Sequence, residues 1–371
     1  MEIRLIAEGE EELCNEFYNR FHKNNRSIQQ WKWEFALNIY REEPIPYAVI
    51  KDDGRIVGTQ ALIPIRMIDK EGIYWTAKSE ETLIDPDYRG KGLLEKLYAL
   101  LFDYARERGF INVWGITSAV KALDRVGFSI PCATKQVIIP FSSNIVRVML
   151  EKDPEGKKES IKDRFRIEIL RSACVLAQAA SSLKFNLNNR RAKSDIDIRT
   201  MDIPDERTGE LCRRFVRKWG GTTIYRDSEY MRWRIFENPH LKSVIKAVYH
   251  NDNLLGWVAF TLGDDGMGYL IDLMAEEGDS GIAGRDLVKA LLIEGIIGAR
   301  NMGACGLRGW RVNNHPFDKL ISKIAKNLGF YIINKGDSAV LYNCNIETKC
   351  FSRNEFNDWF VSRIYTEGTQ G

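Results

Sequence analysis

Apolar residues in the first third of the chain alternate between the two-residue period of a strand and the longer period of a helix. Two extended runs meet at Asp53-Gly54, a pair that favours a tight hairpin turn. A third run leads to Leu83 and Ile84, and a helical stretch then begins at Leu93 and stops at Gly109. The strand segments are 47–50, 55–63, 73–76 with its continuation to Ile84, and 110–116, and the last helix is 117–125.

Landmarks of the first half return in the second half at a nearly constant distance. They also enclose the same succession of hairpin, strand, glycine turn, apolar helix and strand. We therefore predict two lobes of similar α/β fold in tandem. The corresponding landmarks are Trp33 and Trp233, Val57-Gly58 and Leu255-Gly256, and Val126-Gly127-Phe128 and Leu328-Gly329-Phe330, at offsets of 200, 198 and 202 residues.

Changes in composition set the predicted domain boundaries. Residues 1–150 form the first lobe, and 151–196 hold a charged linker and a helix from Ile161 to Leu187. Residues 197–345 form the second lobe, and 346–371 form a C-terminal tail.

Composition limits the classes of protein to consider. The 371 residues carry 54 Lys and Arg against 51 Asp and Glu, a net charge of +3 that gives no reason to expect binding to nucleic acid or an anionic membrane. The start lacks the apolar core of a signal peptide and no apolar run spans a membrane, so we expect a cytoplasmic protein. Seven scattered cysteines favour reduced thiols, and we expect no metal site.

The stretch from Glu81 to Leu94 combines the features of an anion-binding loop. Pro86 and two glycines end the strand just before the helix, whose unpaired amides and dipole attract phosphate. A dinucleotide fingerprint would need a third glycine where Glu95 stands, and the Gly-Lys-Ser/Thr of a Walker loop is missing. The glycines and cations of the loop are Arg89, Gly90, Lys91 and Gly92.

The loop resembles the pyrophosphate loop of the GNAT superfamily of acyl-CoA-dependent N-acyltransferases, which runs Pro-x-Tyr-Arg-Gly-x-Gly-x-Gly/Ala. The matching residues are Pro86, Tyr88, Arg89, Gly90 and Gly92, while Leu94 replaces the usual small residue. The resemblance implies two tandem GNAT-like lobes, the second with a degenerate loop, and acyl-CoA as co-substrate. The implied cofactor-binding residues are Leu83, Ile84, Arg89, Gly90, Lys91, Gly92, Leu93 and Leu94.

The resemblance also implies how the acyl group is handled. The strand ending at Leu83 and Ile84 should separate from its neighbour and pair with pantetheine, with an amide near Ile84 facing the thioester oxygen. By strand alternation Glu81 shares the face of Leu83, and it is our candidate base unless it is a solvated surface carboxylate. Ser79, two residues back on that face, is either a group that orients water or a surface serine. His315 is the remaining catalytic candidate.

The acid that this family uses, a tyrosine four residues before the closing Gly-Phe, is missing from both lobes. Leu123 and Ala325 stand at those positions. A thiol of pKa near ~8.5 leaves as thiolate with little help, so the loss weakens the acid step more than it argues against transfer.

The second lobe offers candidate acceptor-binding residues at the end of its strand. Two guanidinium groups, an indole and the two amides of Asn313 and Asn314 suit a stacked base with phosphates. Alternatively, the indole belongs to the core and the arginines pair with local acids such as Asp318. The candidates are Arg308, Trp310, Arg311 and Asn314.

Together these features resemble most the two-domain enzymes that acylate nucleotide-linked amino sugars. The implied reaction transfers an acyl group from CoA to a primary amine by direct attack in a ternary complex. An N-acetyltransferase for aminoglycosides or protein amines, and a non-catalytic acyl-CoA-binding module, are the alternatives. We expect a small-molecule amine as partner, without nucleic acid or membrane. Acyl length and homo-oligomer formation stay open.

Overall fold

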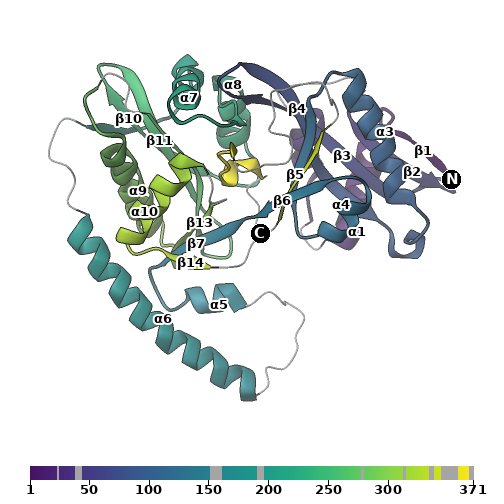
Figure 1. Ribbon diagram of the computed structural model, residues 1–371. Coiled ribbons are helices and arrows are strands. Elements are labelled where there is room, and N and C mark those ends of the chain that lie inside the picture. The colour runs from purple at the N-terminus through teal and green to yellow at the C-terminus, as the bar shows by residue number, and fades with distance from the viewer. Residues whose placement is uncertain are drawn as a thin grey trace.

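Two mixed β-sheets lie side by side in the computed structural model, and helices pack on both of them (Figure 1). The predicted mixed α/β fold is confirmed. The structure describes residues 1–22, 25–37, 44–150, 161–189, 196–276, 280–311, 315–333, 338–343 and 358–366.

The first sheet has the strand order β1-β2-β3-β4-β5-β15-β6, with the short β9 beside β3. Its β2–β3 hairpin turns at Asp53 and Gly54, whose φ angles of 46° and 77° are the left-handed values that a tight turn requires. The strands are β1 (Glu2–Leu5), β2 (Tyr47–Asp52), β3 (Arg55–Ile68), β4 (Ile73–Ile84), β5 (Asn112–Thr117), β6 (Ser129–Ala133), β9 (Thr223–Ile224) and β15 (Ser338–Asn343).

Helices cover both faces of the first sheet because successive strand residues point to opposite faces. Trp31 packs with Tyr47 on one face, whereas Leu97 and Leu101 pack with Ile50 on the other. The first face carries α1 (Glu11–Phe21), α2 (Ile28–Trp31) and the π-helical η1 (Lys32–Ala36). The second face carries α3 (Leu93–Glu107), which begins where it was predicted, and the short α4 (Val120–Arg125) follows β5.

The second sheet has the order β14-β7-β13-β12-β11-β10-β8. Its strands are β7 (Lys135–Pro140), β8 (Asp197–Thr200), β10 (Ser243–His250), β11 (Asn253–Leu262), β12 (Gly268–Ala275), β13 (Gly306–Arg311) and β14 (Tyr331–Ile333). Its helices are α7 (Glu206–Trp219), α8 (Ser228–Met231), the π-helical η3 (Arg232–Phe236), α9 (Gly284–Asn301) and α10 (Pro316–Asn327).

The two halves of the chain exchange strands: the first half gives β7 to the second sheet, and the second half gives β15 and the short β9 to the first sheet. β7 belongs to the first predicted lobe in sequence but lies between β13 and β14 of the second sheet. β15 belongs to the second predicted lobe but lies between β5 and β6 of the first sheet. Each sheet is therefore completed by the other half, so the strands of neither sheet come from one continuous segment. The predicted domain boundaries at residues 150 and 345 remain predictions based on composition.

One pair of the repeated landmarks, Trp33 and Trp233, meets at the contact between the lobes. The helical pairs α2–η1 and α8–η3 have equal lengths and start 200 residues apart. Trp33 donates its indole N–H to the backbone oxygen of Trp233, and Trp233 donates to that of Trp33, both at 3.1 Å. This reciprocal pair indicates that a local two-fold relation connects the lobes.

The described part of the predicted C-terminal tail is buried between the lobes (Figure 1). It contains the 3-10 turn η5 (Arg363–Tyr365). Trp359 and Tyr365 contact Trp114 of β5 with ring centroids 6.0 and 5.2 Å apart. The hydroxyl of Ser362 donates to Asp272 of β12 at 2.5 Å, so this segment contacts both sheets.

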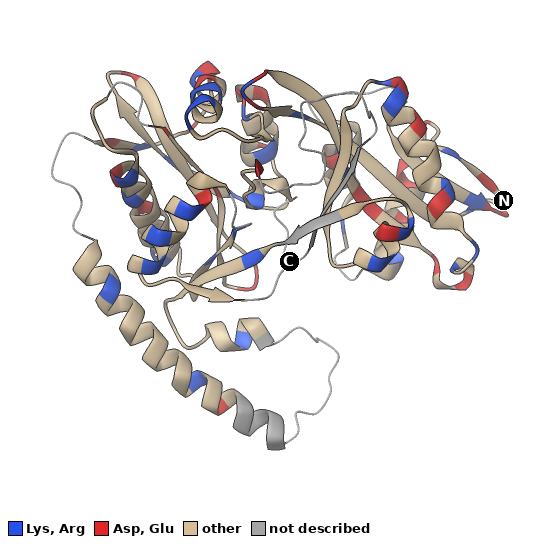
Figure 2. Cartoon of the chain, viewed as in Figure 1, with Lys and Arg blue, Asp and Glu red and all other residues tan. Residues whose placement is uncertain are grey.

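A long helix, α6 (Ile161–Asn188), runs along the outside of the second lobe next to the short α5 (Ile145–Leu150) (Figure 1). It covers the predicted helix at 161–187. Within the described ranges, no helix combines the length and the apolar character needed to cross a membrane. Figure 2 shows that cationic and anionic residues alternate along the helices and strands of both lobes, in keeping with the small net charge.

Candidate functional site

The loop between β4 and α3 has the backbone of an anion site. The 3-10 turn η2 (Pro86–Tyr88) follows Ile84, and Gly90 and Gly92 then adopt φ angles of 77° and 68°. Residues with a Cβ rarely adopt these left-handed values, which explains the two glycines. Gly92 is the N-cap of α3 and no side chain caps the helix there. The first amides of α3 are therefore available to a ligand.

The side chains of the loop leave this helix start open to solvent. Residues 89–92 are exposed, and a Cβ built on Gly90 would meet no atom within 4 Å. Arg89 donates from Nε to the carbonyl of Ile84 at 3.1 Å, and Lys91 Nζ lies 4.6 Å from the ring centre of Tyr88. Two cations thus flank an exposed helix N-terminus, an arrangement that suits a pyrophosphate.

Beside this loop, β4 and β5 separate as predicted. They pair only at Ala77 with Val113 and at Lys78 with Trp114, although β4 continues to Ile84. The amide of Asp85 donates to the carbonyl of Val57 on β3. Because bonding directions alternate along a strand, the amide of Ile84 points the other way, toward the gap left by β5. Among the residues that the structure describes, nothing pairs with this part of β4, so the gap offers a strand edge next to the helix start.

A β-bulge interrupts β4 at Glu81. Thr59 pairs with Leu83 and Ala61 with Glu80, so Glu81 and Thr82 together oppose a single residue of β3. Glu81 has a φ of 54°, a left-handed value that strains a residue with a side chain. The extra residue also reverses the alternation of faces. The prediction that Ser79 and Glu81 share a face is therefore wrong. It assumed that successive residues alternate between the two faces without interruption, and the bulge adds one residue.

Glu81 lies in a buried ionic cluster on the face covered by α1 and α2. Its carboxylate accepts hydrogen bonds from Arg26 and from the hydroxyl of Tyr47, and its side chain is only 2% exposed. Glu34 lies 3.0 Å from the same nitrogen of Arg26. Burial raises the pKa of the Glu81 carboxyl, and Arg26 opposes that shift. Its predicted role as a base remains a prediction, but it is not a solvated surface group.

The second lobe contains an equivalent ion pair. Arg226, 200 residues after Arg26, binds Asp272 of β12 at 2.8 Å, and neither side chain is exposed. Asp272 corresponds to Glu81, because the pairing of Ile84 with Gly58 matches that of Ala275 with Gly256. An arginine–carboxylate pair thus belongs to the scaffold of both lobes, including the lobe whose turn lacks the Arg-Gly-x-Gly element.

Sequence reasoning missed Glu80, the more accessible carboxylate at the bulge. Glu80 forms an ion pair with Lys78, the last β4 residue paired with β5, and its side chain is 30% exposed. It therefore lies at the point where the gap opens. The order of residues gave no signal for it, because only the bulge brings Glu80 and Glu81 to neighbouring positions on one face.

The remaining catalytic candidates lie apart from Glu81. Ser79 contacts the hydroxyl of Tyr98 on α3 at 2.8 Å, on the opposite face of the sheet. His315 is buried at the N-cap of α10, where Nδ1 accepts from the amide of Phe317 and Nε2 donates to the carbonyl of Gly220. These bonds require a neutral ring, and burial lowers the pKa of His315. Its described contacts belong to the second lobe and the C-terminal segment.

The predicted acceptor residues already have partners within the chain. Arg308 donates to Gln136 of the exchanged strand β7. Arg311 lies 3.9 Å from Asp318, which is the local pairing considered as the alternative. Trp310 lies 5.2 Å from the guanidinium of Arg363, a residue of the C-terminal segment that sequence reasoning did not include. Asn314 lies outside the described residues.

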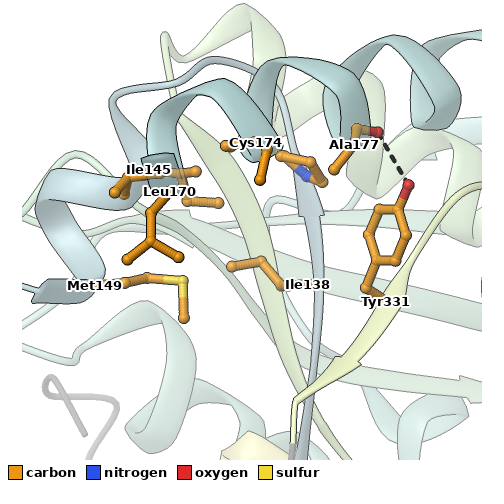
Figure 3. Close-up of a pocket in the computed structure, with 10 residues that line it drawn as sticks. Ile138, Ile145, Met149, Leu170, Cys174, Ala177 and Tyr331 are labelled. Atoms are coloured by element: carbon orange, nitrogen blue, oxygen red, sulfur yellow. Dashed lines mark hydrogen bonds between the residues drawn. The ribbon is translucent and has the colours of Figure 1, made fainter. Parts of the chain in front are cut away.

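A cavity of about 350 Å³ opens under α6, away from the predicted site residues (Figure 3). Its walls are apolar and come from α5, α6, β7 and β14; the hydroxyl of Tyr331 donates to the carbonyl of Ala177 at its edge. It offers no charged group to a phosphate or an amine, so we do not assign it to the site. No metal-binding group of His, Cys, Asp or Glu occurs among the residues that the structure describes.

Comparison with known families agrees with the geometry of the first lobe. Residues 2–130 match the family described as "Acetyltransferase (GNAT) domain". The match covers β1 to β5, the loop and α3, so this part of the chain resembles a GNAT-type acetyltransferase domain. No curated protein matches the chain by sequence.

Solved structures resemble the chain over most of its length. A GCN5-related N-acetyltransferase from Anabaena variabilis aligns with a TM-score of 0.60 and 11% identity over 93% of this chain and 73% of that one. A probable N-acyltransferase from Enterococcus faecalis gives 0.61 and 8%, with 93% and 73% covered. N-myristoyltransferase from Saccharomyces cerevisiae with bound myristoyl-CoA gives 0.59 and 13%, with 92% and 82% covered. At these identities the likeness shows the fold.

Proposed function

We propose that the protein is an acyl-CoA-dependent N-acyltransferase that acylates a primary amine. The observation that carries the proposal is the uncapped start of α3, behind two left-handed glycines and beside the unpaired edge of β4. This combination offers a phosphate site and a strand edge within one short segment. The GNAT domain match at residues 2–130 supports the same reaction class.

The residues of the loop and of β4 fit the parts of acyl-CoA. Arg89, Lys91 and the first amides of α3 would hold the pyrophosphate, and the edge of β4 near Leu83 would pair with pantetheine amides. The amide of Ile84 would stabilise negative charge on the thioester oxygen, a contribution of roughly 3 to 4 kcal/mol in well-studied hydrolases. Because Leu94 is larger than the usual small residue, α3 would lie slightly further from the cofactor.

We assign to Glu80 the role of the base, which accepts the proton that the attacking amine loses. An amine can reach the Glu80 carboxylate, which is 30% exposed, more easily than that of Glu81, which is 2% exposed and holds Arg26 and Tyr47. Glu81 would then hold the bulge of β4 in place, and the bulge would orient the edge of β4 toward the cofactor. The prediction of Glu81 as the base is the competing assignment, and the two make different predictions for the dependence of rate on pH.

As acceptor we propose a nucleotide-linked amino sugar. Support comes from the end of β13, where Arg308, Trp310 and Arg311 occupy the place that corresponds to the end of β5 in the first lobe. Arg311 must exchange its contact with Asp318, 3.9 Å away, for a phosphate. Because both side chains are largely buried, the phosphate has to compensate the charge of Arg311 in place of Asp318.

Calorimetric titration with CoA tests the cofactor part of the proposal. Arg89→Glu and Gly92→Asp should each weaken binding about tenfold or more, or about 1.4 kcal/mol. Arg108→Glu, a charge reversal at the other end of α3, is the matched control and should bind like the unaltered protein. Equal affinity in all four proteins would overturn the site assignment. Thiol release from acetyl-CoA with nucleotide-linked amino sugars, aminoglycosides and peptide amines then identifies the acceptor.

A non-catalytic acyl-CoA-binding module is the second candidate. Leu123 and Ala325 support it, because they are buried apolar residues at the positions of the family's acidic tyrosine. CoA binding without thiol release, over the whole acceptor panel, would favour this candidate.

A further inference from the structure

A closed ring of hydrogen bonds lies on the α3 face of the bulge. Gln60 donates to the hydroxyl of Ser79 at 3.1 Å, and Ser79 is 2.8 Å from the hydroxyl of Tyr98. Tyr98 is 3.1 Å from the hydroxyl of Thr82, which donates back to the amide oxygen of Gln60. Since Thr82 gives its proton to Gln60, Tyr98 must donate to Thr82 and Ser79 to Tyr98. Every hydroxyl proton is used within the ring.

The ring connects the elements that the proposed reaction needs to keep aligned. Ser79 and Thr82 lie on either side of the strained Glu81, and Gln60 lies opposite on β3. Tyr98 lies on α3, five residues after Leu93, the first residue of the helix and part of the phosphate site. Gln60 and Tyr98 are fully buried. The ring therefore fixes the start of α3 relative to the strand edge that ends at Ile84.

The second lobe has no such ring at the equivalent positions. By strand register, Gln60, Ser79 and Thr82 correspond to Val258, Leu270 and Leu273. These residues are apolar, and α9 packs against them, with Gly295 facing Val258 and Leu270. The buried ion pair occurs in both lobes, whereas the ring occurs only in the lobe with the phosphate loop. A fold of this kind thus closes without the ring, which points to a role other than stability.

We propose that Tyr98 is a positioning residue that couples the cofactor's phosphate site at the start of α3 to the alignment of the β4 edge, where the acyl group is transferred. The inference rests on the proposed function. Tyr98 acts through Thr82 and Ser79, and it does not contact the reacting atoms.

Tyr98→Phe tests the proposal, because it removes one hydroxyl and keeps the contacts of the ring with Phe102 and Phe128. Tyr104→Phe is the matched control: it lies on the same helix, and its hydroxyl donates to the carbonyl of Pro44 at 3.2 Å. Thr82→Val opens the ring at a second point, and Thr82→Ser keeps the hydroxyl. CoA affinity, thiol release and hydrogen–deuterium exchange at residues 79–85 with and without acetyl-CoA are measured for each.

Tyr98→Phe and Thr82→Val should bind CoA within about twofold of the unaltered protein, yet lose about tenfold to a hundredfold in thiol release, as expected for a small misalignment. In both, acetyl-CoA should protect residues 79–85 less than it protects them in the unaltered protein. Tyr104→Phe and Thr82→Ser should behave like the unaltered protein.

Two results would overturn the inference. One is protection and turnover in Tyr98→Phe equal to those of the unaltered protein. The other is an equal loss of CoA affinity and turnover, which would make the ring a general stabiliser. If the unaltered protein binds no CoA, the proposed function fails and this inference fails with it. CoA binding with unchanged behaviour in Tyr98→Phe refutes the inference alone.

Discussion

Replacing Glu81 by Gln, with Asp272→Asn as the matched change in the second lobe, tests how the two buried ion pairs differ. Both changes are nearly isosteric, and both remove one negative charge beside a buried arginine. Removing one partner of a buried pair costs about 3–5 kcal/mol, because the other charge is left without compensation.

The hydrogen-bond and ion-pair partners that each arginine keeps determine how much each substitution should lower the free energy of unfolding. Arg26 keeps Glu34 at 3.0 Å after Glu81→Gln. Arg226 binds both oxygens of Asp272, at 2.8 and 3.1 Å, and its other described hydrogen bonds go to neutral oxygens. We therefore expect Asp272→Asn to lower the free energy of unfolding by about 3–5 kcal/mol. Glu81→Gln should lower it by about 1–3 kcal/mol.

Urea unfolding near neutral pH, followed by tryptophan fluorescence, measures both values. CoA affinity in the same buffer should stay within about twofold for both variants, since neither carboxylate contacts the loop. If Glu81→Gln destabilises the protein as much as Asp272→Asn, the reasoning from remaining partners is refuted.

The same variant separates two assignments of the base. If Glu81 only fixes the bulge, Glu81→Gln should lower the rate by a similar factor at every pH. Loss of the acidic limb of the pH–rate profile in this variant would assign the base to Glu81 and would contradict our assignment to Glu80.

Three further predictions follow from the site. Glu80→Gln should lower kcat by about 10² to 10⁴, with partial recovery at higher pH as more amine becomes neutral, and should leave CoA affinity unchanged; a normal rate near pH 7 would exclude Glu80. Calorimetry should find one CoA per chain, because the turn of the second lobe carries Glu276, Glu277 and Asp279; two would contradict this. Burial lowers the pKa of His315 below its unfolded value near 6.5, so the unfolded chain binds more protons and stability falls as pH drops below about 6.5. His315→Asn, which can still cap α10, should flatten that part of the urea-derived stability curve, and an unchanged slope would refute the argument.

The sequence predicted those features that depend on local backbone chemistry. Gly90 and Gly92 need left-handed φ angles, the helix after them has a helical apolar period, and Asp53-Gly54 makes a tight turn. Each requirement acts over a few neighbouring residues, so it leaves a visible pattern. The repeat was visible because its tryptophans, glycines and apolar residues return at a nearly constant offset.

The features that the sequence did not reveal depend on distant partners. The bulge at Glu81 requires Gln60 on β3 and Arg26 before α2, and nothing in residues 79–84 marks an extra residue. The exchange of β7 and β15 was hidden because an apolar strand fits either sheet equally well. The cap formed by His315 was also unexpected, because Ser, Thr, Asp and Asn are the usual capping residues.

Comparison of the two lobes separates scaffold from function within one chain. Features present in both lobes, such as the Arg26–Glu81 and Arg226–Asp272 pairs and the reciprocal tryptophans, are needed to build the fold. Features of the first lobe alone are the cationic glycine loop, the ring around Tyr98 and the Lys78–Glu80 pair at the opening of the gap. All three lie along β4 or at the start of α3. Because the second lobe folds around apolar residues at the ring positions, stability alone does not explain the polar groups of the first lobe, and the proposed acyl transfer along β4 gives each of them a role.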